Sequence, residues 1–159
     1  QICSAGSGAY ESLPPHITAT TGMDALTHAV EAYIGKSNTK ETIEDSVSAV
    51  KLIFKNLEKA YQNGEDMEAR ENMQKASFLA GAAFTRAYVG YVHAIAHSLG
   101  GEYGIPHGLA NAVILPYVLE AYGSSVYISL AELADIVKIG QNLESDQEKA
   151  NALLQRSKR

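Results

Sequence analysis

The chain has 159 residues with 13 basic and 18 acidic side chains, which give a formal net charge of −5 at pH 7. This length suits one ordinary domain, and a negative charge without a basic stripe argues against nucleic acid as a partner. The single cysteine, Cys3, allows no internal disulfide, and no apolar run is long enough to span a membrane. We therefore predict a soluble, cytoplasmic protein with no membrane partner.

The beginning of the chain is rich in Gly and Ser and has no periodic apolar pattern. We interpret residues 1–12 as an irregular segment or linker and residues 13–159 as one helical domain. Within this domain Asp24 and His28 are four residues apart, which places both side chains on one face of a helix. His16 precedes this pair and is interpreted as a surface loop residue.

A long amphipathic helix is predicted between residues 43 and 61, because the apolar residues recur there at steps of four and three. These residues are Ile43, Val47, Val50, Phe54, Leu57 and Tyr61. Asn38 followed by Glu41 is typical of a helix start. Asn63 and Gly64 predict where the helix ends, since both tolerate positive φ.

Three further helices follow in the sequence. An alanine-rich helix is predicted from Asp66 to Phe84, and another over residues 107–122, which include Pro116. Ser145 and Glu148 have the spacing of a capping box before the last predicted helix. No stretch shows sustained alternation of period two, so we predict an all-α fold, a helical bundle.

Histidines are concentrated in residues 93–108, whose sequence is HAIAHSLGGEYGIPHG. His93 and His97 share one helix face by their spacing, and His107 lies in a proline-glycine turn that can fold back toward them. With Asp24 and His28, these side chains supply a carboxylate and several imidazoles. Such ligands are typical of a divalent metal site, so residues 13–159 are predicted to form a helical metal-binding domain.

Each of these residues also has a simpler explanation when it is taken alone. Asp24 can favour the positive end of its helix, His28 can be a core histidine, and His107 can cap the helix that follows it. The joint pattern favours the metal site, because four of the five histidines and an aspartate share these two segments.

The segments TGMDALTHAVEAY and HAIAHSLGGEYGIPHGLANAVILP resemble the C-terminal helical half of the iron-containing alcohol dehydrogenases, also called group III metal-dependent alcohol dehydrogenases. The resemblance extends from about Leu13 to Gly140 and implies the helical bundle of the dehydroquinate synthase-like fold. By this resemblance the metal ligands are placed at four positions, Asp24, His28, His93 and His107. It places His97 near the nicotinamide and the substrate, as the catalytic and cofactor-binding residue.

The same resemblance implies what the intact enzyme contains. An N-terminal α/β half binds NAD or NADP in that family, and the chain has no G-x-G-x-x-G stretch of its own. We therefore expect it to be part of a longer enzyme, truncated at both ends relative to the family. Fe(II) is the expected metal, although the ligands also suit zinc. The expected partners are a small alcohol or aldehyde substrate and further copies of the chain in a homo-oligomer.

In this interpretation the metal polarises the oxygen of the alcohol or aldehyde for hydride transfer to or from NAD(P). Two alternatives stay open. The chain can be a helical metal-binding fragment that is inactive by itself. It can also belong to the metal-dependent helical hydrolases, which is the weaker alternative because those enzymes often carry an adjacent His-Asp pair and this sequence has none.

Overall fold

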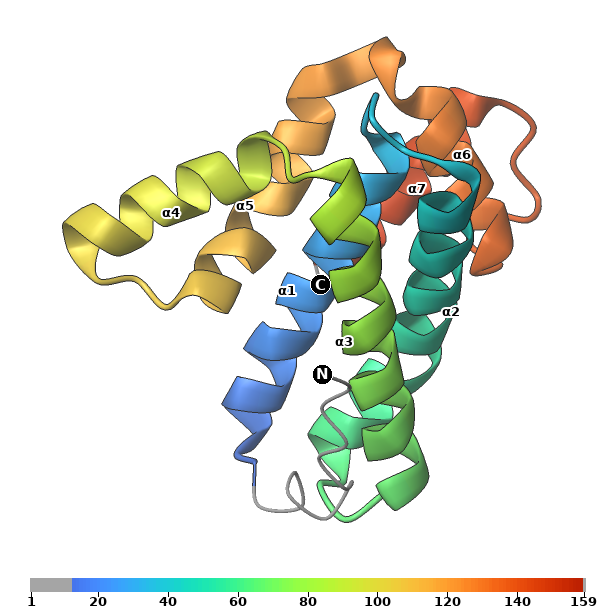
Figure 1. The fold of residues 1–159 in the computed structure, drawn as a ribbon. Coiled ribbons are helices and arrows are strands. Elements are labelled where there is room, and N and C mark those ends of the chain that lie inside the picture. Colours follow the sequence, from blue (N-terminus) through green and yellow to red (C-terminus); the bar gives the residue numbers. More distant parts are fainter. Residues whose placement is uncertain (1–12, 159) are drawn as a thin grey trace.

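The computed structural model describes residues 13–158, which contain seven α-helices, one 3₁₀ turn and no strand (Figure 1). The prediction of an all-α fold is therefore confirmed, whereas the irregular segment predicted for residues 1–12 lies outside the described residues. The helices are α1 (Pro15–Ile34), α2 (Lys40–Gln62), α3 (Met67–Ala87), α4 (Tyr91–Tyr103), α5 (His107–Tyr122), α6 (Tyr127–Ile136) and α7 (Asp146–Ser157), with the 3₁₀ turn η2 (Gly123–Ser125) between α5 and α6.

Helix α1 is the central element of the bundle. It packs against α2 and α3 on one side and against α5 on another, while α6 and α7 pack on each other. Figure 1 shows α4 and the first turns of α5 projecting sideways from this bundle. The largest fully buried apolar side chains come from four helices and are Ile53, Leu115, Leu130, Leu133, Val50 and Val92. Leu26 and Val30 of α1 are buried in the same core, and their burial fixes the position of α1, from which the site is built.

The start of α2 differs from the prediction made from Asn38 and Glu41. The N-cap is Thr39, whose side chain accepts from the backbone N–H of Thr42, while the Thr42 hydroxyl accepts from the N–H of Thr39. Asn38 instead donates its side-chain amide to the carbonyl of Tyr33, 2.8 Å away, at the end of α1. Asn38 therefore caps the preceding helix, because a free carbonyl there also requires a partner.

Other helix boundaries match the sequence patterns. Asp66 caps α3, and Ser145 with Glu148 forms the predicted capping box of α7. Helix α2 ends before Asn63 as expected, but the φ of Asn63 is −132°, so the helix stops through extended backbone and not through a left-handed residue. His16 lies in the first turn of α1, where it is exposed, and not in a loop.

In the described part of the chain, no single helix is both long and apolar enough to cross a membrane. Residues 107–125 and 127–136 are both long and apolar enough only as a pair, and the pair is bent by 119°.

The capping box of α7 leads to a first prediction. Ser145→Ala removes the oxygen that accepts from the Glu148 N–H, so the variant should lose about 1 kcal/mol of unfolding free energy. Urea unfolding followed by circular dichroism measures this loss. Ser48→Ala, at an exposed position inside α2, is the matched control and should leave stability unchanged or slightly higher. Equal effects of the two changes would contradict the assignment.

Candidate metal centre

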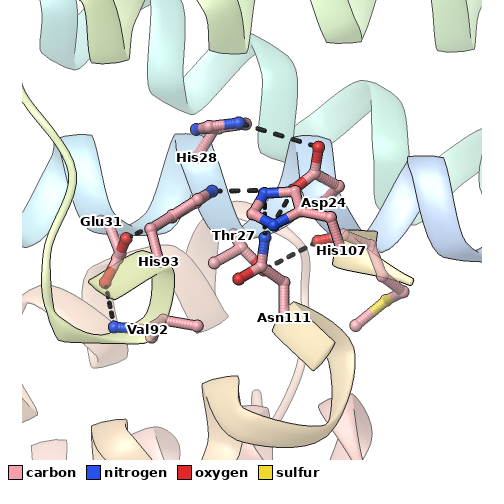
Figure 2. A network of polar contacts seen from close by, with 9 residues as sticks. Asp24, Thr27, His28, Glu31, Val92, His93, His107 and Asn111 are labelled. Carbon is pink, nitrogen blue, oxygen red and sulfur yellow. Dashed lines mark hydrogen bonds and ion pairs between the residues drawn. The ribbon is translucent and has the colours of Figure 1, made fainter. Parts of the chain in front are cut away.

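Three helices bring the predicted site residues together (Figure 2). Asp24 and His28 lie one turn apart on α1, His93 lies in the first turn of α4, and His107 is the first residue of α5. Because α4 and α5 both return to the same face of α1, side chains that are about seventy to eighty residues apart in the sequence meet at one point.

The Asp24 carboxylate is the centre of this arrangement. Its Oδ2 lies 3.8 Å from Nε2 of His28, and its Oδ1 lies 3.6 Å from Nε2 of His93 and 3.3 Å from Nε2 of His107. One ligand atom each from Asp24, His28 and His93 lies within 4.8 Å of the others, a grouping that can hold a metal ion. Figure 2 shows the three imidazoles around this carboxylate.

Exposure differs sharply across the centre. The side chain of His93 is 1% exposed, that of Asp24 is 27% exposed, and that of His107 is 40% exposed. Helix α4, with His93, therefore forms the buried side of the centre, which we call the buried wall. The first turn of α5, with His107, forms the exposed side, which we call the open edge. A small molecule approaching from solvent would reach the centre on the side of His107.

The structure places His97 beside this group and not within it. The His97 ring is 4.9 Å from that of His107 and 6.2 Å from that of His93, measured between ring centroids. His97 is exposed, so it borders the open edge. His93 and His97 lie on one face of α4, as their spacing predicted. His97 is one turn further along the helix and therefore further from Asp24 than His93 is.

Two polar residues of the site were not predicted from the sequence. Glu31 on α1 is buried, and its Oε2 lies 2.6 Å from Nδ1 of His93. Asn111 on α5 is also buried and donates to Asp24 Oδ1 at 2.6 Å, with the same amide nitrogen 3.0 Å from His107 Nε2. The signal for both was helical spacing: Glu31 continues the face of Asp24 by two turns, and Asn111 lies one turn after His107.

Burial raises the pKa of both carboxylates, but their contacts outweigh this effect. For Asp24, the contacts with His93 and Asn111 hold the pKa below its usual value. For Glu31, the hydrogen bonds with His93 and with the backbone N–H groups of Gly90 and Val92 do the same. Both groups are therefore anionic near neutral pH, as a cation site requires.

The two most enclosed imidazoles differ in electrostatic environment. Burial and the nearby His93 together lower the pKa of His28 to about 4 against the opposing effect of Asp24, so this ring stays neutral. Burial also opposes charge on His93, but the contacts with Asp24 and Glu31 prevail and raise its pKa to about 9. Without another cation in the centre, a protonated His93 balances the two carboxylates.

The donor set fits a divalent ion. His93 Nε2 is buried and has no hydrogen-bond partner among the described residues, although it faces the Asp24 carboxylate. An uncompensated buried nitrogen is costly, and a metal ion satisfies it by accepting its lone pair. Imidazole nitrogens with a single carboxylate suit iron, zinc and other first-row divalent ions.

A close helix contact holds the open edge in place. A Cβ added to Gly108 would lie 2.3 Å from the backbone oxygen of Thr20 on α1, so only glycine permits this approach. The contact sets how near the first turn of α5, with His107, comes to Asp24.

Comparisons with known proteins identify the family of the chain. Residues 18–158 match the family described as "Fe-containing alcohol dehydrogenase family, C-terminal". The chain is 52% identical over 124 residues to alcohol dehydrogenase 4 of Schizosaccharomyces pombe, covering 78% of this chain and 29% of that protein. It is 50% identical over 131 residues to 1,3-propanediol dehydrogenase of Klebsiella pneumoniae, covering 82% of this chain and 33% of that one.

Solved structures give the same result. A crystal structure of a 1,3-propanediol oxidoreductase superposes with a TM-score of 0.89 at 43% identity, over 92% of this chain and 38% of that one. An alcohol dehydrogenase from Oenococcus oeni superposes with a TM-score of 0.89 at 39% identity, with the same coverage of both chains. The chain thus spans about a third of the length of the relatives it matches.

The Gly108 contact leads to a second prediction. Gly108→Ala forces α5 away from α1, and the overpacking should cost about 1–3 kcal/mol of unfolding free energy. Gly101→Ala is the matched control, since nothing lies within 4 Å of a Cβ added at that helical position. The control should stabilise the chain by about 0.5–1 kcal/mol. Thermal unfolding of both variants measures the difference, and a neutral Gly108→Ala would refute the close contact.

Proposed function

The chain belongs to the iron-containing alcohol dehydrogenase family, and on that premise we propose that it forms the helical, metal-holding part of an enzyme that interconverts alcohols and aldehydes with NAD(P). The observation that carries this proposal is the convergence of Asp24, His28 and His93 at a centre with one open edge. The relatives are about three times as long as the region they share with this chain, so the activity proposed is that of a longer protein.

We assign the metal ligands to Asp24, His28, His93 and His107. Three imidazole nitrogens face the Asp24 carboxylate from three helices, and each lies less than 4 Å from one of its oxygens. Only one ligand is charged, so an ion held there keeps a positive charge. We propose residues 13–159 as the domain that supplies these ligands, which agrees with the family match over residues 18–158.

When bound, the ion supplies a Lewis acid that polarises the oxygen of an alcohol or aldehyde, and NAD(P) accepts or donates the hydride. We propose Fe(II) because of the family, and the ligand types also suit zinc. His107 lies at the open edge, and so does His97, where a substrate has room to approach. His97 is proposed to orient the substrate and to exchange protons with solvent, because its imidazole is exposed beside His107.

The proposed substrates are small alcohols and aldehydes. Among the relatives, the protein of Klebsiella pneumoniae is named for 1,3-propanediol, and one of Clostridium saccharobutylicum, 40% identical over 136 residues, is an NADPH-dependent butanol dehydrogenase. Both names describe short alcohols. We further propose a reducing, cytoplasmic location, which the single cysteine supports.

A third prediction separates ligands from neighbours. Replacing Asp24, His28, His93 or His107 with alanine should weaken binding of a divalent ion more than about tenfold, because each change removes a bond to the ion. His97→Ala should have a much smaller effect, because it alters only the surroundings. The chain and its variants are loaded anaerobically with Fe(II) and separately with Zn(II), and their metal content is measured after desalting.

The outcomes of this experiment are distinct. If His97→Ala loses as much metal as His93→Ala, the ligand assignment is wrong. If all variants retain as much metal as the parent, these residues serve as core and cap residues only.

A fourth prediction concerns turnover by the chain alone. The sequence has no G-x-G-x-x-G stretch to hold a pyrophosphate, so the purified, metal-loaded chain should not reduce NAD or NADP with a primary alcohol. Nicotinamide absorbance measures this activity, and calorimetry measures NAD(P) binding. Saturable NAD(P) binding together with turnover of 1-propanol would show that the chain is sufficient by itself. Bound metal without turnover is the expected result and also fits the alternative of an inactive metal-binding fragment.

A further inference from the structure

We propose that Glu31 is a positioning residue for the metal centre: its carboxylate holds the His93 ring so that Nε2 presents its lone pair to the ion. This inference rests on the proposed function and extends it to a residue outside the ligand set. The supporting observation is that the Glu31 carboxylate lies beside Nδ1 of the His93 ring, while Nε2 of the same ring faces Asp24.

Both oxygens of Glu31 have defined partners. Oε2 lies 2.6 Å from Nδ1 of His93, and Oε1 accepts from the backbone N–H of Val92 at 2.8 Å. A Cβ added to Gly90 would lie 2.7 Å from Oε1, so the chain leaves just enough room for the carboxylate. The Glu31 side chain is 2% exposed and therefore has no competing water contacts. It joins the last turn of α1 to the first turn of α4 and fixes the ring plane of His93.

The chemistry of these partners sets the tautomer. An ionised carboxylate only accepts hydrogen bonds, so the nitrogen beside it, Nδ1 of His93, must carry the hydrogen. In the neutral ring the lone pair is then on Nε2, which lies 3.6 Å from Asp24 Oδ1 and has no hydrogen-bond partner among the described residues. A carboxylate in this position orients a ligating histidine and raises its basicity.

His28 provides an internal contrast. Its Nδ1 is buried and lacks a hydrogen-bond partner in the described part of the chain, and its ring is held by stacking between Phe84 and His93 at 4.1 and 4.0 Å. Stacking fixes the plane of a ring but not the position of its proton. Of these two imidazoles, only that of His93 has its tautomer fixed by a carboxylate.

Glu31→Gln tests this role with little change of shape. If the amide oxygen keeps the Val92 N–H, the NH₂ group faces Nδ1 of His93 and favours the tautomer with its hydrogen on Nε2, which cannot bind the ion. If the amide flips, its NH₂ group meets the Val92 N–H and two donors oppose each other. Either orientation should weaken Zn(II) binding by about 10- to 100-fold, measured by competition with a chelator.

Two control variants separate positioning from general damage. Glu132→Gln makes the same change at a carboxylate that accepts from the Tyr33 hydroxyl at 2.7 Å, and it should leave Zn(II) affinity unchanged. Arg70→Met removes a buried guanidinium that bonds Thr18 and the carbonyl of Gly64. Arg70→Met should lower the melting temperature without lowering Zn(II) affinity.

A second readout reports the tautomer directly. Long-range ¹H–¹⁵N correlation spectra of the metal-free chain, recorded where the His93 ring is neutral, should show the hydrogen on Nδ1 in the parent. In Glu31→Gln the hydrogen should move to Nε2 where the amide oxygen keeps the Val92 N–H, and should stay on Nδ1 where the amide is flipped. Glu31→Asp retains an ionised acceptor and should restore the Nδ1 hydrogen and part of the affinity. If Glu31→Gln does not fold, the tautomer and affinity of Glu31→Asp still decide the question: hydrogen on Nε2 in that variant would contradict the inference.

The outcomes distinguish the two proposals. Glu31→Gln with Zn(II) affinity within twofold of the parent, or with a loss no greater than that of Arg70→Met, would overturn the role of Glu31 alone. A parent chain that binds no Zn(II) would overturn the proposed function, and the role of Glu31 with it.

Discussion

Removal of one face of α1 from water is the constraint on which the site depends. This face carries Asp24, His28 and Glu31 in successive turns. Helix α5 packs on α1, and the first turn of α4 reaches this face through the contacts of Val92 and His93 with Glu31. Burying two carboxylates is costly unless each is paired and hydrogen-bonded. His93, the N–H of Val92 and the amide of Asn111 provide those partners, so the polar contacts and the helix packing form together.

The remaining helices make this arrangement rigid. Helices α2 and α3 pack along α1, and Phe84 of α3 stacks on His28 at 4.1 Å. Through this apolar contact, the position of α3 determines where the His28 ring lies in the centre. On the opposite side, glycine at position 108 lets α5 approach the backbone of α1. The proposed ligands are thus placed by interhelical distances, which a packed core resists changing.

Much of this structure follows from local sequence patterns. Steps of three and four predicted the long helices, and the Ser145 capping box predicted the start of α7. The paired histidines indicated the candidate site. Glu31 and Asn111 were missed because each looks like an ordinary helix residue until the partner helix is in place. The cap of α2 was missed for a related reason, since Asn38 serves the end of α1. Local pattern identifies which residues can act, whereas contacts between helices decide their partners.

The unequal exposure of the ligands has a kinetic consequence. Chelators and water reach the centre from the side of His107, whereas His93 on the far wall is sealed by α4. For an ion held by the four proposed ligands, we expect exchange to start at His107, the most exposed of them, and the enclosed ligands to come off only after that first step. Dissociation of an ion is then stepwise and begins at the open edge. Its rate depends on motion of the first turn of α5, even when the equilibrium affinity is set by the residues of the buried wall.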